Sequence, residues 1–172
     1  MSPAFFRRRN LPRLMPWILA WLLALPALAA GPEPAAGLPL CSSFAADGLI
    51  AQQRKVPILV FYTRPPCPWC MQARLEQLLP LANDPAAAGR VLIREVVLDS
   101  RTPLVDFDGR SITHGDFAKA HRINMVPTLD FLDERGNRLV EPIVGVRVAD
   151  YYGAVIDRAI DESLAKLRTE TK

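Results

Sequence analysis

The sequence predicts an α/β fold in which a central mixed sheet of about four to five strands is flanked by helices. Two apolar runs, Ile58–Tyr62 and Val91–Leu98, have the length and composition of buried strands. The chain between them carries a helical pattern from Pro68 to Leu81. A strand, a helix and a second strand in this order form a βαβ unit with a right-handed crossover, so the sheet is at least partly parallel.

The segment before the first strand is predicted to be a capped helix. Ser42 and Ser43 are good N-cap residues, and the helix that they begin is expected to run to about Gln53. The following sequence Arg54–Pro57 ends this helix, because the residue before a proline is pushed out of helical conformation.

The middle of the chain leads away from the sheet and back. Residues 100–112 form an irregular excursion, with a turn or small hairpin near residues 105–109. A capping box made by Thr113 and Asp116 then opens a helix that continues through His121. One more helix is therefore expected between the second and third strands.

The last part of the chain predicts a hairpin and a long helix. Val126–Leu132 has the pattern of a strand, and a turn over residues 133–137 joins it to a second strand at Arg138–Val144. Gly145 breaks that strand. Residues 150–167 carry apolar side chains at helical spacing, which indicates a helix that packs one face against the sheet.

Cys67 and Cys70 lie at the junction between the first strand and the helix that follows it. A helix N-terminus carries unpaired N–H groups and about half a unit of positive charge, which favours a thiolate there. Cys67 is therefore the expected nucleophile. The two-residue spacing brings Cys70 close enough to attack a mixed disulfide formed at Cys67. Pro68 fits the first helical position, where no N–H is needed.

Metal binding is the alternative interpretation of this spacing. Zinc sites also use CxxC, but zinc normally takes four ligands, and the two histidines of the chain do not follow at zinc-finger spacing. Met71 rather than histidine follows Cys70, which excludes a CxxCH haem attachment site. Met71, Met125 and the two cysteines would make a poor copper site. We therefore expect no metal, and no cofactor beyond a redox-active Cys67–Cys70 disulfide.

The N-terminus has the pattern of an export signal. Four arginines between residues 7 and 13 precede an apolar stretch over residues 14–30, and Ala27–Ala29 offers the small residues of a signal-peptidase site. An uncleaved membrane anchor is the alternative, and only in that case would the protein contact the membrane. Export places the protein in the periplasm. The chain then divides into a signal peptide over 1–29, a linker rich in Pro, Ala and Gly over 30–42, and one domain over 43–172.

The basic character of the chain belongs to this signal. The formal net charge is +3, and removing the four arginines lowers the number of basic residues from 21 to 17, against 18 acidic residues. The remainder has no cluster of Lys and Arg interleaved with aromatic residues. We therefore expect no nucleic-acid partner.

Cys41, the third cysteine, follows the linker directly. It is interpreted as a half-buried cysteine that acts as a small hydrophobic residue before the first helix. An intermolecular disulfide or a lipidated N-terminal cysteine are the alternatives, and lipidation fits poorly because bulky residues precede Cys41.

The order of these elements resembles the thioredoxin fold over residues 43–168. The resemblance implies that the Val126–Pro127 peptide bond is cis and lies beside the cysteines, where the backbone of Val126 is free to pair with a substrate strand. The chain looks most like exported bacterial thiol-disulfide proteins of the SoxW type. The signal, the Arg64-Pro65-Pro66 lead into Cys67 and the run from Pro127 to Asp133 carry that closer likeness.

The chain departs from ordinary thioredoxins beneath the nucleophile. Phe61 stands where they carry a buried aspartate, six residues before the nucleophile, and Glu95 falls where they carry a lysine that pairs with it. We therefore hypothesise that Glu95 takes the proton of Cys70 while Cys70 resolves a mixed disulfide. The alternative is that Glu95 is a solvated charge at a strand edge.

These features predict an exported thiol-disulfide oxidoreductase that reduces disulfides of cell-envelope proteins. Trp69, between the cysteines, is expected to be an exposed aromatic plate that contacts partners, and the alternative is that it packs over the start of the helix. A membrane electron donor is expected to re-reduce the protein, because the periplasm holds no reducing buffer. A disulfide oxidase or isomerase of the same fold, and a non-catalytic module that binds a client or a metal, are the alternatives.

Overall fold

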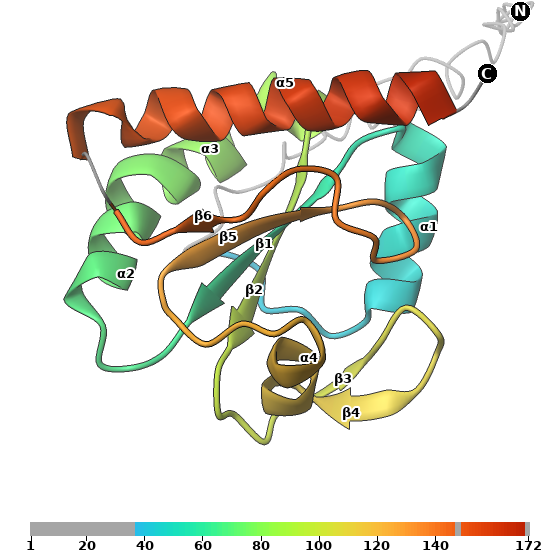
Figure 1. Ribbon diagram of the computed structural model, residues 1–172, viewed down its shortest axis with the longest axis vertical. Coiled ribbons are helices and arrows are strands. Elements are labelled where there is room, and N and C mark those ends of the chain that lie inside the picture. Colours follow the sequence, from blue (N-terminus) through green and yellow to red (C-terminus); the bar gives the residue numbers. More distant parts are fainter. Residues whose placement is uncertain (1–36, 147–148, 171–172) are drawn as a thin grey trace, which may run out of the picture. The chain divides into compact units, whose positions relative to one another are not determined.

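A computed structural model describes residues 37–146 and 149–170 (Figure 1). Four main strands and five helices follow the predicted order, with a small hairpin inserted between β2 and α4. Their bounds are α1 (Phe44–Arg54), β1 (Ile58–Thr63), α2 (Pro68–Ala73), α3 (Leu79–Asn83), β2 (Leu92–Val97), β3 (Pro103–Val105), β4 (Ser111–Thr113), α4 (His114–Ala120), β5 (Thr128–Leu132), β6 (Ile143–Val144) and α5 (Tyr152–Glu170).

The four main strands form one mixed sheet in the order β2-β1-β5-β6. β1 pairs in parallel with β2 and antiparallel with β5, and β6 adds to the far side of β5 in antiparallel orientation. All six residues of β1 are buried, as its uninterrupted apolar sequence requires of a central strand. The predicted mixed sheet of four to five strands and the parallel βαβ unit are therefore confirmed.

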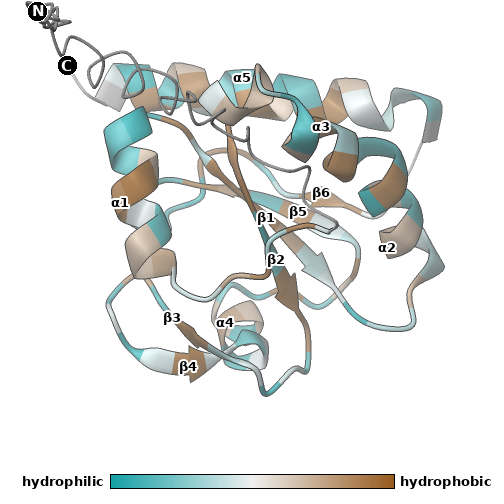
Figure 2. Ribbon diagram, turned by 180° about the vertical axis from the view of Figure 1, so that it is seen from behind, coloured by the Kyte–Doolittle hydropathy of each residue, from teal (hydrophilic) through white to brown (hydrophobic). Residues whose placement is uncertain are grey.

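Helices cover both faces of this sheet. α5 lies with the α2–α3 segment on one side, while α1, α4 and the β3–β4 hairpin lie on the other (Figure 1). Phe44 of α1 stacks on Phe117 of α4 with ring centroids 4.2 Å apart, and Phe107 stacks on Phe44 at 4.9 Å. Seen from behind, the strands are largely hydrophobic, whereas α5 alternates between hydrophobic and hydrophilic residues (Figure 2).

The helix that follows the cysteines is not continuous. Between α2 and α3 the residues Arg74–Leu78 form a π-helical turn, in which the N–H of Leu79 bonds to the carbonyl of Arg74. Pro80 lies just beyond this turn and lacks the N–H that a regular α-helical bond would use. The predicted helix over residues 68–81 is therefore present, but it contains a change of winding.

The strand predicted at Arg138–Val144 is much shorter in the structure. Only Ile143 and Val144 pair as β6, and Arg138 forms an isolated bridge with Leu132. Pro142 has no N–H to give to a ladder, which explains why pairing stops between these two points. Gly145 ends β6 with a φ of 70°, a backbone conformation that favours glycine, as predicted from the sequence.

The predicted apolar face of the last helix is confirmed in most positions. Ile156, Ala159, Ile160 and Leu164 are buried against the sheet, but Tyr151 and Val155 from the same stripe are 67% and 43% exposed. These two lie near the beginning of α5, beside β6. Apolar surface is therefore left uncovered at that end of the sheet.

Part of the segment predicted to be a linker packs on the domain. Leu38 and Cys41 are buried, and residues 39–41 run parallel to β2. The N–H of Cys41 donates to the carbonyl of Glu95 at 2.9 Å, and the N–H of Glu95 donates to the carbonyl of Pro39 at 2.9 Å. The segment covers the open edge of β2, so the domain begins before residue 43.

The predicted signal peptide lies outside the described residues. Within residues 37–146 and 149–170, no helix has the length and apolar character needed to cross a membrane.

Candidate active site

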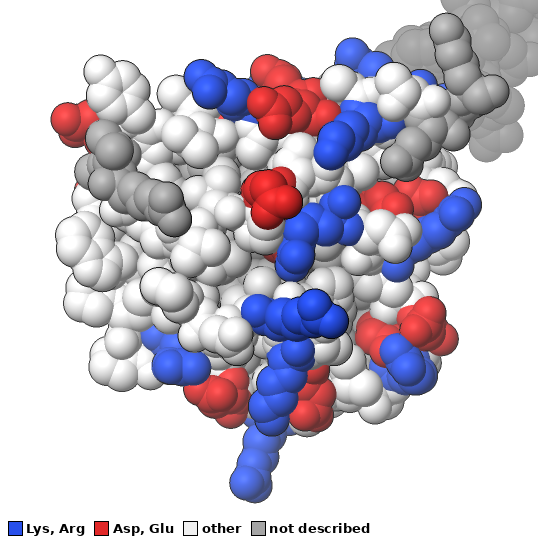
Figure 3. All heavy atoms as spheres, in the orientation of Figure 1, with Lys and Arg blue, Asp and Glu red and all other residues white. Residues whose placement is uncertain are grey.

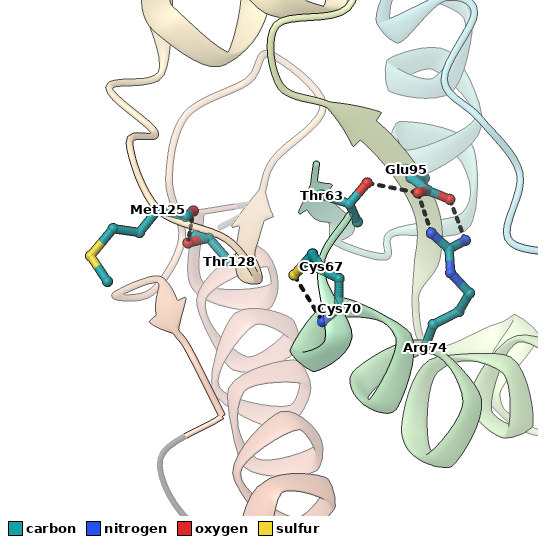
Figure 4. The surroundings of a disulfide bond; sticks show 7 residues. All are labelled: Thr63, Cys67, Cys70, Arg74, Glu95, Met125 and Thr128. Carbon is teal, nitrogen blue, oxygen red and sulfur yellow. Dashed lines mark hydrogen bonds and ion pairs between the residues drawn. A yellow bond between two sulfur atoms is a disulfide. The ribbon is translucent and has the colours of Figure 1, made fainter. Parts of the chain in front are cut away.

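The two cysteines of the CxxC motif are joined by a disulfide at the start of α2 (Figure 4). Cys67 is the N-cap residue, with an extended backbone, and its sulfur accepts a hydrogen bond from the N–H of Cys70 at 3.1 Å. Pro68 occupies the first turn, where its missing N–H leaves no bond unmade. The helix start therefore offers a hydrogen-bond donor to the sulfur of Cys67, which is the arrangement that favours a thiolate.

The two sulfurs differ in their access to a partner. The Cys67 side chain is partly exposed, whereas Cys70 is buried, with 3% of its surface exposed. An incoming disulfide can therefore reach Cys67 but not Cys70. This difference suits Cys67 as the nucleophile and Cys70 as the residue that resolves a mixed disulfide.

The Val126–Pro127 peptide bond is cis, as the resemblance implied. The carbonyl of Pro127 accepts a hydrogen bond from the N–H of Gly145 at 2.8 Å, which ties this turn to the end of β6. The hydroxyl of Thr128 donates to the carbonyl of Met125 at 2.8 Å and closes the turn (Figure 4). Val126 is half-buried and Pro127 is buried.

A second cis peptide bond was not expected. It joins Pro65 to Pro66, directly before Cys67. The Pro65-Pro66 pair, part of the segment that carries the resemblance to the SoxW type, therefore has a cis bond that was not predicted from the sequence.

Glu95 lies on β2, opposite Phe61 of β1, and is buried, with 6% of its surface exposed. It is not the solvated charge of the alternative interpretation. It is not an unpartnered carboxyl either. The two terminal guanidinium nitrogens of Arg74, Nη1 and Nη2, donate to its two oxygens, and the Thr63 hydroxyl donates to Oε1 at 2.9 Å (Figure 4). Its role as acceptor of the Cys70 proton stays a prediction.

Arg74 and Thr63 were not identified by the sequence analysis. Arg74 follows Cys70 by four residues, so it lies one helical turn farther along the same side of the helix, and this spacing is a signal that was available. Its guanidinium also lies 5.5 Å from the centre of the Phe61 ring. Hydrogen bonding to Glu95 raises the pKa of Arg74 above its ordinary value.

Exposed apolar side chains surround the disulfide. Trp69 is 59% exposed, which leaves much of its ring open to a partner, and Met71 and Met125 are 50% and 63% exposed. In the space-filling view, the surface over β6 and the start of α2 carries few charged groups. Most charged groups of this face lie on its other half (Figure 3). A partner that reaches Cys67 therefore meets mainly uncharged surface.

Cys41 is more buried than predicted, with 2% of its surface exposed, and it forms no disulfide. Its sulfur lies 3.8 Å from a carboxylate oxygen of Asp47. Burial, together with the charge of Asp47, raises the pKa of Cys41 to about 12. A thiol in this state is a poor nucleophile at neutral pH.

The histidines do not form a metal site in the described part of the chain. Both ring nitrogens of His114 are engaged, because Nδ1 accepts from the N–H of Val97 at 3.2 Å and Nε2 lies 2.9 Å from the carbonyl of Cys41. Between residues 37 and 170, leaving aside 147 and 148, no three His, Cys, Asp or Glu side chains gather as metal ligands would.

Comparison with known proteins places this geometry in a family. A model described as a thioredoxin-like domain matches residues 45–160, well over half of the 172-residue chain. A search of curated proteins found no match. Among solved structures, a DsbH oxidoreductase aligns with a TM-score of 0.51 and 20% identity, over 77% of this chain and 90% of that chain. Thioredoxin O2 from Arabidopsis thaliana, in the oxidised state, aligns with a TM-score of 0.47 and 19% identity over 71% and 93%.

The family match and the DsbH likeness agree with the strand order of the sheet. The chain therefore has the thioredoxin fold and belongs to the thioredoxin-like domain family.

Proposed function

We propose that this protein is an exported thiol-disulfide oxidoreductase that reduces disulfides of cell-envelope proteins. The observation that carries the proposal is the dithiol pair at the start of α2, in which an accessible Cys67 is backed by a buried Cys70. The cis-Pro127 turn, tied to Gly145, supports it because it leaves a half-buried Val126 beside the site.

In the proposed reaction the thiolate of Cys67 attacks one sulfur of a partner disulfide. A Cys67–partner disulfide forms, and the other partner sulfur leaves as a thiolate. Cys70 then loses its proton and attacks the sulfur of Cys67, which releases the second partner thiolate and closes the Cys67–Cys70 disulfide. Two electrons pass from the protein to the partner, and a dithiol electron donor in the membrane returns them.

Glu95 is the proposed acceptor of the Cys70 proton, with the Thr63 hydroxyl bonded to it. Replacement of Glu95 by Gln removes the basic oxygen and keeps the shape of the side chain. We expect the variant to release the partner from the mixed disulfide more slowly than the wild type. Stopped-flow measurements from pH 6 to 9 monitor this release. Equal release rates in the variant and the wild type across this range would remove Glu95 from the reaction.

Export and the reducing direction rest on the N-terminal sequence and on the resemblance to exported proteins of the SoxW type. Cell fractionation followed by intact-mass measurement tests export. A periplasmic protein whose intact mass equals that of a chain starting at Ala30 supports a cleaved signal. A membrane-bound protein with the mass of the full-length chain supports the anchor. A cytoplasmic full-length chain would contradict export.

Trp69 provides the measurement that tests the direction. The other two tryptophans, Trp17 and Trp21, lie within the predicted signal, so Trp69 is the only one in a chain that begins at Ala30. Its emission is titrated against glutathione and dithiothreitol buffers, with Cys67→Ser as the control that cannot form the disulfide. A potential of about −250 mV or lower supports a reductase, whereas about −120 to −180 mV indicates an oxidase or isomerase. No redox-dependent change with both thiols free indicates a binding module.

A further inference from the structure

We propose that Arg74 is a positioning residue for this dithiol: its guanidinium balances the buried Glu95 carboxylate, and the balance sets how readily Cys67 exists as a thiolate. The inference deepens the proposed function and concerns the same cysteines. Arg74 bonds to Glu95 and is not proposed to touch the reacting sulfurs. It acts through Glu95 and through the charge that the pair presents to the site.

The contacts connect the pair to both elements that carry the cysteines. Arg74 continues the helix of Cys70, and its N–H bonds to the carbonyl of Cys70. Thr63 ends β1, four residues before Cys67, and its hydroxyl bonds to Glu95. Figure 4 shows the Thr63 and Arg74 side chains converging on the Glu95 carboxylate from these two directions. The Glu95 carboxylate is therefore bonded both to the helix that carries Cys70 and to the end of β1, which leads to Cys67.

Because both side chains are largely removed from solvent, the charges of this pair act over a longer distance than surface charges do. The exposed fractions of the side chains are 20% for Arg74 and 8% for Glu95, so water and salt screen them weakly. The guanidinium also lies over the Phe61 ring, 5.5 Å from its centre. Arginine suits this position because its planar fork binds a carboxylate through two hydrogen bonds and stacks on an aromatic ring.

Other charged groups near the cysteines are exposed. Arg64, three residues before Cys67, pairs with Asp99 at 2.8 Å, and the two side chains are 48% and 66% exposed. Glu76 on the outer side of the helix is also exposed and bonds to Gln72. Solvent weakens these interactions. The Arg74–Glu95 pair is less exposed than these groups, so solvent screens its charges less.

Breaking the pair from either side gives opposite predictions. Arg74→Gln leaves a buried negative charge, which opposes a nearby thiolate and is expected to raise the Cys67 pKa by about one unit. Glu95→Gln leaves a buried positive charge and is expected to lower it by a similar amount. One unit is about tenfold in the thiolate fraction below the pKa. The double variant Arg74→Gln/Glu95→Gln is expected to return close to the wild type, and Arg74→Lys to keep most of the wild-type value.

The measurement is the rate at which iodoacetamide alkylates Cys67 as a function of pH. The protein is reduced chemically beforehand and the product is located by peptide mass. This measurement needs no substrate protein and no electron donor, so it is independent of the direction of the physiological reaction. A wild-type dithiol that does not re-form its disulfide would contradict the proposed function, while the alkylation profiles would still decide the role of Arg74.

The sheet itself offers a matched control. Arg94, next to Glu95 on β2, binds both carboxylate oxygens of Asp47 in α1, and these side chains are 19% and 7% exposed. Consecutive strand residues face opposite sides of a sheet, so this pair lies on the other face from Glu95. Arg94→Gln therefore breaks an ion pair of the same kind and burial on the face of the sheet opposite Glu95, where it contacts Cys41 but neither Cys67 nor Cys70. It is expected to lower the melting temperature as Arg74→Gln does, without moving the alkylation profile.

Opposite shifts for Arg74→Gln and Glu95→Gln, cancelled in the double variant, support the inference. Shifts of the same sign, or profiles that coincide with the wild type in folded variants, overturn it. If Arg74→Gln does not fold, Glu95→Gln and Arg74→Lys decide the matter. The inference then fails when Glu95→Gln leaves the profile unmoved or raises the Cys67 pKa.

Discussion

Replacing Trp69 with Ala tests whether the exposed ring beside the disulfide binds partner proteins. A tryptophan side chain offers up to about 250 Å², so its exposed fraction of 59% leaves about 150 Å² for a partner. If a protein covers half of this area, about 75 Å² at about 25 cal/mol per Å² stabilises the encounter by about 2 kcal/mol. That free energy corresponds to a loss of roughly 25-fold in kcat/KM.

The assay compares two substrates with the same variant. Reduction of a protein disulfide, such as that of insulin, is expected to lose the full factor. Reduction of a small aromatic disulfide, followed by absorbance, covers little of the ring and is expected to change by less than about threefold. Leu49→Ala is the control, because Leu49 is 69% exposed on α1, an element that carries neither cysteine. Equal losses on both substrates would refute the reasoning and indicate that Trp69 acts by packing.

Three further predictions concern Cys41, Gly136 and His114. In the reduced, folded protein an alkylating reagent is expected to modify Cys67 within minutes at neutral pH but Cys41 only after unfolding. The reason is that burial raises the pKa of Cys41 to about 12. Rapid labelling of Cys41 in the folded protein would contradict this prediction. Gly136→Ala is expected to lower the free energy of unfolding by about 2–4 kcal/mol, because φ is 85° and a Cβ would lie 2.5 Å from the Phe107 ring. Gly109→Ala, with φ 82° and open space around it, should cost only about 1 kcal/mol in the same denaturant titration, and equal costs would remove the steric argument. Burial lowers the pKa of His114 in the folded protein. Near pH 6.5 the unfolded chain therefore binds a proton that the folded protein does not bind, and stability falls as the pH drops below this value. His114→Gln should make the slope of unfolding free energy against pH shallower by up to about 1.4 kcal/mol per pH unit below pH 6.5, and an unchanged slope would show that His114 does not titrate differently on folding.

Several elements were predictable because their cause is local. The N-cap of α1 at Ser43 and that of α4 at Thr113 depend on side chains that bond to backbone within three residues. The burial of β1 follows from its uninterrupted apolar sequence. The position of Cys67 at the start of a helix likewise follows from the apolar run before it and the proline after it.

Other features depend on residues that are distant in the sequence. Pro142 is a local signal that the strand expected at Arg138–Val144 is interrupted, but which residues still pair with β5 depends on the partner strand. The segment over 38–41 joins the sheet because the edge of β2 is open to it, although its composition resembles a linker. Neither outcome can be inferred from the local pattern of apolar residues.

The sequence by itself determined the fold class, the dithiol and the roles that its spacing allows, because periodicity and helix-start chemistry are written within short segments. Only the tertiary structure decided what charge lies beneath that dithiol. Glu95 and Arg74 are 21 residues apart, and they meet because the parallel pairing of β1 with β2 brings Glu95 opposite Phe61, under the helix that carries Cys70. A buried carboxylate has to find its partner in space, and the pairing of strands determines which side chain is within reach.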